Sequence, residues 1–324
     1  MIKIDLPEKM EFTASLDAVK TILDHALLQS DDLVADIMRH LTLANGKNFR
    51  AMLLLAASTD KDGYVPRNAM ISAAALEILH LATLLHDDVI DDAEIRRGQP
   101  SIQNMFGKKS AVICGDYLFC KCFLLVADMS AQFQERFKDI AKAMTKICMG
   151  EFRQFKHNGD TSLSVRDYFR IIAGKTSALF SLALYSGAIV GGNDEKEARC
   201  LARFGYYIGM IFQLMDDCMD YETDYLTAKK SVKHDLAEGV ITLPLIYAIY
   251  KKPELKDVIK NHTPTASELN SIISDVLALG CVDTTRDVAE RYYQKAKKTL
   301  NRIQDEKKRK LFSEILEKIK TRKF

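Results

Sequence analysis

Six aspartates form two groups with the same spacing. They are Asp87, Asp88 and Asp91, then Asp216, Asp217 and Asp220, so the pattern Asp-Asp-x-x-Asp returns after 129 positions. In a helix, the first and last aspartate of a group lie on one face. Two like charges at this spacing destabilise the helix by roughly 0.2–0.5 kcal/mol per pair. One such group alone is typical of a solvated helix end. Two copies beside apolar sequence favour a site for a hard cation, Mg²⁺ or Ca²⁺, that bridges an anionic ligand.

A metal-bound phosphate or diphosphate also needs cations or helix N-termini around it. Candidates are Lys47 and Arg50 near an expected helix start, Arg96 and Arg97 in the loop after the first aspartate group, and Lys175-Thr176 inside a helical pattern. His80 lies two turns before Asp87 on the same face, although a core histidine held by a neighbour is an equal alternative. Each candidate alone is weak, because Lys and Arg are usually solvated. Their coincidence with the paired acids favours a diphosphate site.

Composition argues against several other classes of protein. Of 324 residues, 48% are hydrophobic, enough for a large core, and a formal net charge of +2 gives no bulk attraction to nucleic acid. The seven cysteines contain no Cys-x-x-Cys pair, as expected of reduced residues in a cytosolic core. The N-terminus lacks a basic segment followed by an apolar run, so we expect a cytoplasmic protein. The uncharged stretch 176–193 carries serines and glycines and predicts a buried helix.

The distribution of helix-breaking residues predicts the elements that position these groups. No proline occurs from residue 101 to residue 243, which leaves long helices free to form. Apolar residues recur at spacings of three and four, as in Phe204, Ile208 and Ile211, without sustained alternation of period two. Segments 59–66 and 93–100 are among the predicted loops. We therefore predict an all-α fold with a single domain over residues 1–324.

Taken together, the motifs resemble those of the trans-prenyl diphosphate synthases. The matching segments are Gly46-Lys47 with Arg50, Glu77 with His80, His86 to Asp91, Arg96-Arg97-Gly98, Gly115-Asp116-Tyr117, Gly150-Glu151 with Gln154, Lys175-Thr176, Phe212-Gln213 with the second aspartate group, and Asp235-Leu236 with Thr242-Leu243-Pro244. The resemblance implies the isoprenoid synthase fold, a large helical bundle with a deep central cavity, usually as a homodimer. It implies that three Mg²⁺ ions join the aspartates to an allylic diphosphate, whose ionisation leaves a cation that isopentenyl diphosphate attacks.

The resemblance also implies a role for each matching residue. All six aspartates would be metal ligands or their supports, with Lys175 beside them in catalysis. The residues implied to hold the allylic diphosphate are Arg96, Lys175, Thr176, Gln213 and Lys230, and those implied to hold isopentenyl diphosphate are Lys47, Arg50, His80 and Arg97. Val240 departs from the pattern, because the family often has a diphosphate-binding lysine there, and Lys233 is a candidate replacement.

Small side chains before Asp87 favour a long product. The prenyl tail would run back along the helix that carries Asp87, where short-chain members tend to place bulky aromatic residues at the positions of Ala82 and Thr83. Each isoprene unit is about as long as one helical turn, roughly 5.4 Å, so small residues permit many additions. We predict a heptaprenyl or octaprenyl product, suited to a quinone side chain, whose length is set by Leu79, Ala82 and Thr83.

Other interpretations stay open from the sequence. A short-chain synthase would stop at a farnesyl or geranylgeranyl product, and the resemblance to heptaprenyl-type catalytic subunits allows a chain that is active only with a small regulatory subunit. A metal phosphohydrolase, suggested by His80, His86 and Asp87, leaves the second aspartate group unexplained. Residues 291–324 hold 13 Lys or Arg and 4 Asp or Glu, which favours a solvated helix face and at most peripheral contact with anionic lipid.

Overall fold

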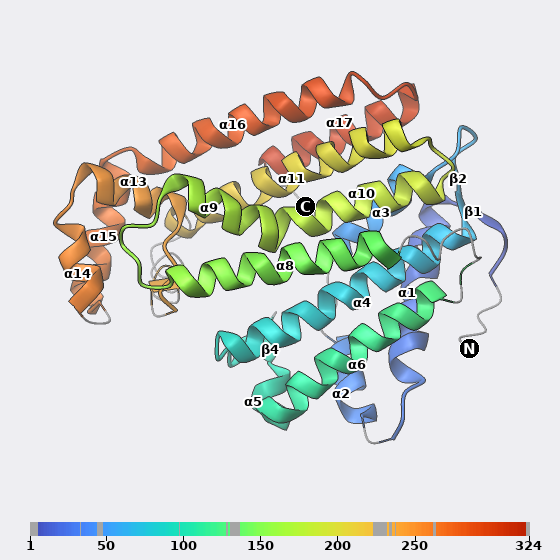
Figure 1. The fold of residues 1–324 in the computed structure, drawn as a ribbon, viewed down its shortest axis with the longest axis horizontal. Helices are drawn as coiled ribbons and strands as arrows, with labels where there is room; N and C mark the ends of the chain where they lie inside the picture. The colour runs from blue at the N-terminus through green and yellow to red at the C-terminus, as the bar shows by residue number, and fades with distance from the viewer. Residues whose placement is uncertain are drawn as a thin grey trace. The chain divides into compact units, whose positions relative to one another are not determined.

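The computed structural model describes residues 6–32, 34–43, 48–96, 98–127, 129, 137–222, 232, 235–236, 238–261 and 264–321. This part is almost entirely helical, which confirms the predicted all-α class (Figure 1). The helices are α1 Phe12–Leu28, α2 Ala35–Leu43, α3 Phe49–Ser58, α4 Arg67–Ile90, α5 Ile102–Phe106, α6 Lys108–Ala127, α8 Phe137–His157, α9 Val165–Ile172, α10 Ala178–Val190, α11 Glu195–Glu222, α13 Leu243–Lys251, α14 Leu255–Asn261, α15 Ala266–Ala278, α16 Cys281–Leu300 and α17 Glu306–Thr321, and the π-helical turn η1 is Ala173–Ser177.

Two short antiparallel strand pairs accompany the helices. Strand β1, Lys9–Glu11, pairs with β2, Tyr64–Pro66, and β3, Ile95–Arg96, pairs with β4, Gln99–Pro100. Strand β2 and the β3–β4 pair lie in the segments 59–66 and 93–100 that the sequence predicted as loops. Pairs this short carry no period-two signal, so the sequence did not reveal them.

Contacts within the chain group its residues into two compact units. The first unit consists of Met1–Ala141, Leu182–Ala202 and Asp305–Lys308, and the second of Lys142–Ser181, Arg203–Gln304 and Arg309–Phe324. The first aspartate group belongs to the first unit and the second group to the second unit, so each is described by itself. The single domain over residues 1–324 stays a prediction.

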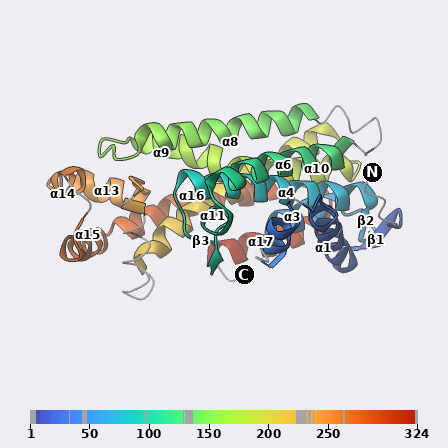
Figure 2. The ribbon, with the colours of Figure 1, turned by 90° about the horizontal axis from the view of Figure 1, so that it is seen from below.

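Helix α4 is the central element of the first unit. It packs against α6, α3 and α1, and Figures 1 and 2 both show α6 alongside it. Its alanines, including Ala69, Ala73 and Ala74, are fully buried. By length and composition α4 and α6 are the two described helices that could cross a membrane; the apolar window of α4 is 61% buried and that of α6 is 39% buried. The burial of α4 is what a core helix of a folded protein requires.

Helices α3 and α10 approach each other closely in the same unit. A Cβ atom on Gly187 would lie only 2.2 Å from the carbonyl oxygen of Leu54, and one on Gly191 would lie 2.6 Å from that of Ser58. Ala183 and Leu184 of α10 are fully buried. This part of the stretch 176–193 is therefore a core helix, as predicted.

In the second unit, α13 packs against α15 and α16 around a common apolar core. Figure 1 shows α13, α14 and α15 gathered at one end of α16. Helix α15 begins with a capping box, in which Thr265 and Glu268 satisfy each other's backbone N–H groups. The long helix α11 approaches η1 closely, because a Cβ atom on Gly209 would lie 2.5 Å from the Cα of Ser177.

We expect Gly187→Ala to lower the free energy of unfolding by about 1–3 kcal/mol, because the added methyl group would push α10 away from the α3 backbone. Urea denaturation followed by circular dichroism measures the change. Ser181→Ala, at a half-buried position on the same helix, is the control and should change stability by less than about 1 kcal/mol. Equal stability of the Gly187→Ala variant and the parent would contradict the close packing.

Candidate active site

The first aspartate group lies at the C-terminal end of α4. Asp88 is 4% exposed, whereas Asp87 and Asp91 are half-buried. The β3–β4 hairpin follows and places Arg96 so that its Nε donates to Asp88 Oδ1 at 2.6 Å. Burial raises the pKa of Asp88 by more than the ion pair with Arg96 lowers it. Arg96, predicted to hold the allylic diphosphate, thus holds the middle aspartate, while the outer two stay accessible.

The second aspartate group lies on α11 and has the same arrangement. Asp217 is 2% exposed, whereas Asp216 and Asp220 are half-buried. The hydroxyl of Tyr168 donates to Asp217 Oδ2, and Gln213 Nε2 donates to Asp217 Oδ1 at 2.9 Å. Burial outweighs these hydrogen bonds and raises the pKa of Asp217 to about 6. A cation nearby would favour its ionised form.

In both groups the accessible pair consists of carboxylates four residues apart on one helix. Mg²⁺ typically takes one or two carboxylates and completes its shell with water and phosphate oxygens. Within the described ranges no three His, Cys, Asp or Glu side chains form a metal site by themselves. The donor set therefore fits a hard cation whose remaining ligands come from water and an anionic substrate.

Lys175 and Thr176 lie on the π-helical turn η1, a feature that often marks functional sites. Thr176 Oγ1 donates to Gln213 Oε1 at 2.8 Å, and Gln213 in turn donates to Asp217. One hydrogen-bonded chain therefore joins two of the predicted diphosphate-binding residues to the second aspartate group. Lys175 Nζ lies 3.1 Å from Glu151 Oε2 on α8, so an acid holds this lysine in place.

Two glycines let α8 approach η1. A Cβ atom on Gly150 would lie 2.6 Å from the backbone nitrogen of Lys175, and one on Gly174 would lie 2.7 Å from the carbonyl oxygen of Lys146. Sequence reasoning assigned no role to Glu151 or Tyr168. The motif Gly150-Glu151 could have indicated Glu151, because the glycine before this acid allows α8 to come close to η1. Nothing in the sequence marked Tyr168, which meets Asp217 from 49 positions away.

Arg50 and His80, predicted to hold isopentenyl diphosphate, lie together in the first unit. Arg50 Nη1 is 3.0 Å from His80 Nε2. Asn48 precedes α3 in a left-handed backbone conformation and its side chain does not cap the helix. The buried carboxylate of Glu77 instead accepts from the N–H of Ala51 at 2.8 Å. This bond ties the start of α3 to α4 and keeps Arg50 beside His80.

His86 lies where α4 packs against α6, and its Nε2 is 3.4 Å from Asp116 Oδ1. Its ring packs against Phe119 with centroids 5.3 Å apart, and its Nε2 lies 3.2 Å from the carbonyl oxygen of Val112. Gly115 makes room for it, because a Cβ there would lie 2.3 Å from His86 Nε2. His80 is paired with Arg50, and no group of three His, Cys, Asp or Glu side chains that could hold a metal forms among the described residues, so nothing in them favours the phosphohydrolase interpretation.

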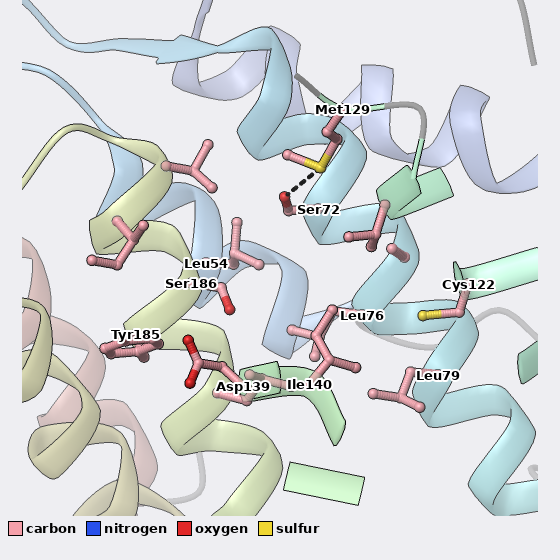
Figure 3. Close-up of a pocket in the computed structure, with 15 residues that line it drawn as sticks. Leu54, Ser72, Leu76, Leu79, Cys122, Met129, Asp139, Ile140, Tyr185 and Ser186 are labelled. Atoms are coloured by element: carbon pink, nitrogen blue, oxygen red, sulfur yellow. Dashed lines mark hydrogen bonds between the residues drawn. The ribbon is translucent and has the colours of Figure 1, made fainter. Parts of the chain in front are cut away.

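A pocket in the first unit lies along α4 (Figure 3). Its α4 residues, Leu79, Leu76, Ala75 and Ser72, step away from the end of the helix that carries Asp87. Of the three residues predicted to set product length, Leu79 lines this pocket. Ala82 is fully buried outside the lining, and the half-buried Thr83, also outside it, donates to the carbonyl oxygen of His80. The role of these three residues stays a prediction.

The other predicted residues are placed as follows. Lys47, Arg97, Lys230 and Lys233 lie outside the described residues. Because the two aspartate groups belong to different compact units, the expectation that they enclose one diphosphate stays a prediction. Each unit nevertheless brings together predicted partners from separate helices, which is the pattern expected of a binding site.

Comparisons with known proteins agree with this geometry. Residues 31–276 match the family model described as polyprenyl synthetase. The chain is 32% identical over 325 residues to heptaprenyl diphosphate synthase component 2 of Bacillus subtilis (strain 168), covering 99% of this chain and 92% of that protein. It is similar to the crystal structure of heptaprenyl diphosphate synthase from Staphylococcus aureus, with a TM-score of 0.88, 26% identity and coverage of 97% and 99%. It is also similar to a polyprenyl synthase from Caulobacter crescentus CB15 complexed with calcium and isoprenyl diphosphate, with a TM-score of 0.85, 30% identity and coverage of 96% of each chain.

We expect Tyr168→Phe to lower the free energy of unfolding by roughly 1.5–3 kcal/mol, because the buried carboxylate of Asp217 loses a donor. Urea denaturation at neutral pH measures the loss. Tyr221→Phe is the matched control, since Tyr221 is equally buried but its hydroxyl lies 3.4 Å from the uncharged hydroxyl of Thr242 rather than against a carboxylate. The control should lose about 1 kcal/mol or less, and an equal loss in both variants would contradict the role assigned to Tyr168.

Proposed function

We propose that the chain, which belongs to the polyprenyl synthetase family and is a prenyl diphosphate synthase, condenses isopentenyl diphosphate with an allylic diphosphate. Farnesyl diphosphate is an example of such an allylic substrate. The proposed product is a long all-trans polyprenyl diphosphate, heptaprenyl or octaprenyl. One catalytic domain over residues 1–324 carries out the reaction. The heptaprenyl names of two similar proteins support this length.

The observation that carries the proposal is the repeated aspartate arrangement. In each group a buried, hydrogen-bonded aspartate anchors a helix end whose outer two carboxylates stay accessible. We propose that Asp87, Asp91, Asp216 and Asp220 hold Mg²⁺, with Asp88 and Asp217 as their supports. Mg²⁺, three ions by the family resemblance, would stabilise the departing diphosphate. The calcium in the Caulobacter structure supports a hard cation that prefers oxygen ligands.

The basic residues would orient the two substrates. Arg50 and His80 would bind isopentenyl diphosphate, because the guanidinium and the imidazole lie next to each other and can both donate hydrogen bonds to a diphosphate. Lys175 would bind the allylic diphosphate, held ready by Glu151 until the substrate arrives. The hydrogen bonds from Thr176 to Gln213 and from Gln213 to Asp217 would hold this binding site in a fixed position relative to the second aspartate group. The roles assigned by resemblance to Arg96, Arg97, Lys47 and Lys230 are part of the same proposal.

The pocket along α4 would take the growing tail. Leu76, Leu79 and Val126 give it an apolar lining, which suits a hydrocarbon and keeps water from the allylic cation. A short-chain product remains the alternative, and product analysis decides between them.

We propose a homodimer and infer its interface from α6. Ile113 and Leu124 are 65% and 60% exposed. Cys120, which is also exposed, lies seven residues after Ile113 and four residues before Leu124, so all three side chains share one face of the helix. Exposed apolar stripes of this kind mark protein interfaces. Because the Bacillus relative is named component 2, a small regulatory partner subunit is the alternative occupant of this face.

Leu124→Glu should convert the dimer into a monomer at micromolar concentration, because a charge would be buried in the interface. Light scattering after size-exclusion chromatography gives the mass. Leu277→Glu, which changes a 45% exposed leucine on α15, is the control and should leave the dimer intact. A monomeric parent chain, or a Leu124→Glu variant that stays dimeric, would rule out this interface.

We further propose a cytoplasmic enzyme whose product serves quinone biosynthesis. The basic residues near the C-terminus would allow peripheral contact with anionic lipid during delivery. Some of these basic side chains interact with the protein itself. Lys308 is buried and donates to the carbonyl oxygen of Ala57, and Lys320 forms an ion pair with Glu290. Contact would therefore be weak and no nucleic acid is expected to bind.

The proposed function predicts that the purified chain, given farnesyl diphosphate, isopentenyl diphosphate and Mg²⁺, forms heptaprenyl or octaprenyl diphosphate. Reversed-phase chromatography of the dephosphorylated products measures chain length, and addition of a chelator should abolish the reaction. Products that stop at farnesyl or geranylgeranyl length would contradict the long-chain proposal. Inactivity that is relieved by a partner subunit would support the two-component alternative.

The pocket is tested in the same assay. Ala75→Leu adds bulk to the pocket lining and should shorten the product by at least one isoprene unit. Ala74→Leu adds the same bulk at a buried position of α4 that does not line the pocket, so it should cost stability without shortening the product.

A further inference from the structure

The carbonyl oxygen of Ala93 accepts hydrogen bonds from two side chains that follow the β3–β4 hairpin. Ser101 Oγ donates to it at 2.6 Å and Gln103 Nε2 donates to it at 2.8 Å. Both donors are buried, with Ser101 2% and Gln103 7% exposed. A carbonyl oxygen has two lone pairs, so this one is fully used. Because Ala93 lies just before the hairpin and Ser101 directly after it, these bonds join the two ends of the hairpin.

The hairpin needs such a closure because its own strands are short. Strands β3 and β4 have two residues each, and a strand pair of this size is marginal by itself. The chain also leaves α4 through Asp92 with a φ of 49°, a left-handed conformation that costs energy and must be held by its surroundings. Ala93 N donates to the carbonyl oxygen of Asp88 at 2.9 Å, and His40 Nε2 lies 2.8 Å from the carbonyl oxygen of Pro100. Bonds from outside the two strands therefore determine how the hairpin lies against α4.

The orientation of the hairpin matters because the hairpin carries Arg96. Its Nε donates to Asp88 Oδ1 at 2.6 Å, and Asp88 is 4% exposed. A buried carboxylate that loses its donor is costly, so a hairpin that moved away from α4 would disturb the middle aspartate of the first group. We propose that Ser101 and Gln103 are positioning residues, which close the base of the hairpin and thereby hold Arg96 on Asp88. Where it concerns catalysis, this inference rests on the proposed function.

Two substitutions separate closure of the hairpin from capping of the next helix. Ser101 is also the N-cap of α5, where its Oγ accepts from the N–H of Asn104 at 3.2 Å. Ser101→Ala therefore removes the cap together with the closing bond. Gln103 is not a cap, so Gln103→Met, which has a similar size, removes a closing bond and leaves the cap in place. An effect shared by both variants comes from the closure.

Hydrogen exchange followed by mass spectrometry tests the closure without any substrate. In Ser101→Ala and in Gln103→Met, the amide hydrogen of Ala93 should exchange about five- to tenfold faster than in the parent chain, because the hairpin opens more often. Ser101→Thr keeps a hydroxyl and should exchange at close to the parent rate. Thr265→Ala is the matched control, because Thr265 is the N-cap of α15 and lies outside the hairpin. It should leave the exchange of Ala93 unchanged.

Steady-state kinetics test whether the closure acts through Arg96. Ser101→Ala should lower kcat/KM for the allylic diphosphate about tenfold, while in an Arg96→Gln background the same change should lower it less than about twofold, because no guanidinium is left to position. An equal loss in both backgrounds would overturn the inference, and so would exchange of Ala93 at the parent rate in Ser101→Ala. Absence of prenyl transfer by the parent chain would instead refute the proposed function, while the exchange of Ala93 would still test the closure.

Discussion

The burial of one carboxylate in each aspartate group is the constraint on which the rest of the site depends. An ionised carboxylate inside a protein is costly unless donors surround it. Asp88 obtains them from Arg96, which requires the β3–β4 hairpin to fold back over the end of α4. Asp217 obtains them from Tyr168 and Gln213, which requires α9 to pack against α11. The elements around each group are therefore held by the same contacts that leave the outer carboxylates accessible.

Helix α4 combines two kinds of chemistry along its length. Its last turn carries Asp87, Asp88 and Asp91, and its preceding turns line an apolar pocket with Ala75, Leu76 and Leu79. A substrate that is a diphosphate at one end and a hydrocarbon at the other needs this order. The rigid rise of the helix, about 1.5 Å per residue, separates the two environments by a set distance.

Close helix approaches make these arrangements possible. Gly150 and Gly174 bring α8 against η1, so that Glu151 reaches Lys175. Gly115 accepts the ring of His86 against α6, and Gly187 lets α10 lie on the backbone of α3. Each glycine removes a Cβ that would stand less than 3 Å from another atom. Glycines, which have no side-chain chemistry of their own, therefore determine how closely these helices approach one another.

The sequence by itself determined the helical class and the two aspartate groups, because helical periodicity and spacings of four residues are local properties. It also predicted Arg50, His80, Thr176 and Gln213 as site residues through the resemblance of their motifs to a family. Only the tertiary structure decided which aspartate of each group is buried and that Arg96 pairs with Asp88. It alone brought Glu151 to Lys175 and Tyr168 to Asp217, across 24 and 49 positions. Such contacts arise from the packing of separate helices, and spacing along one helix carries no information about its neighbours.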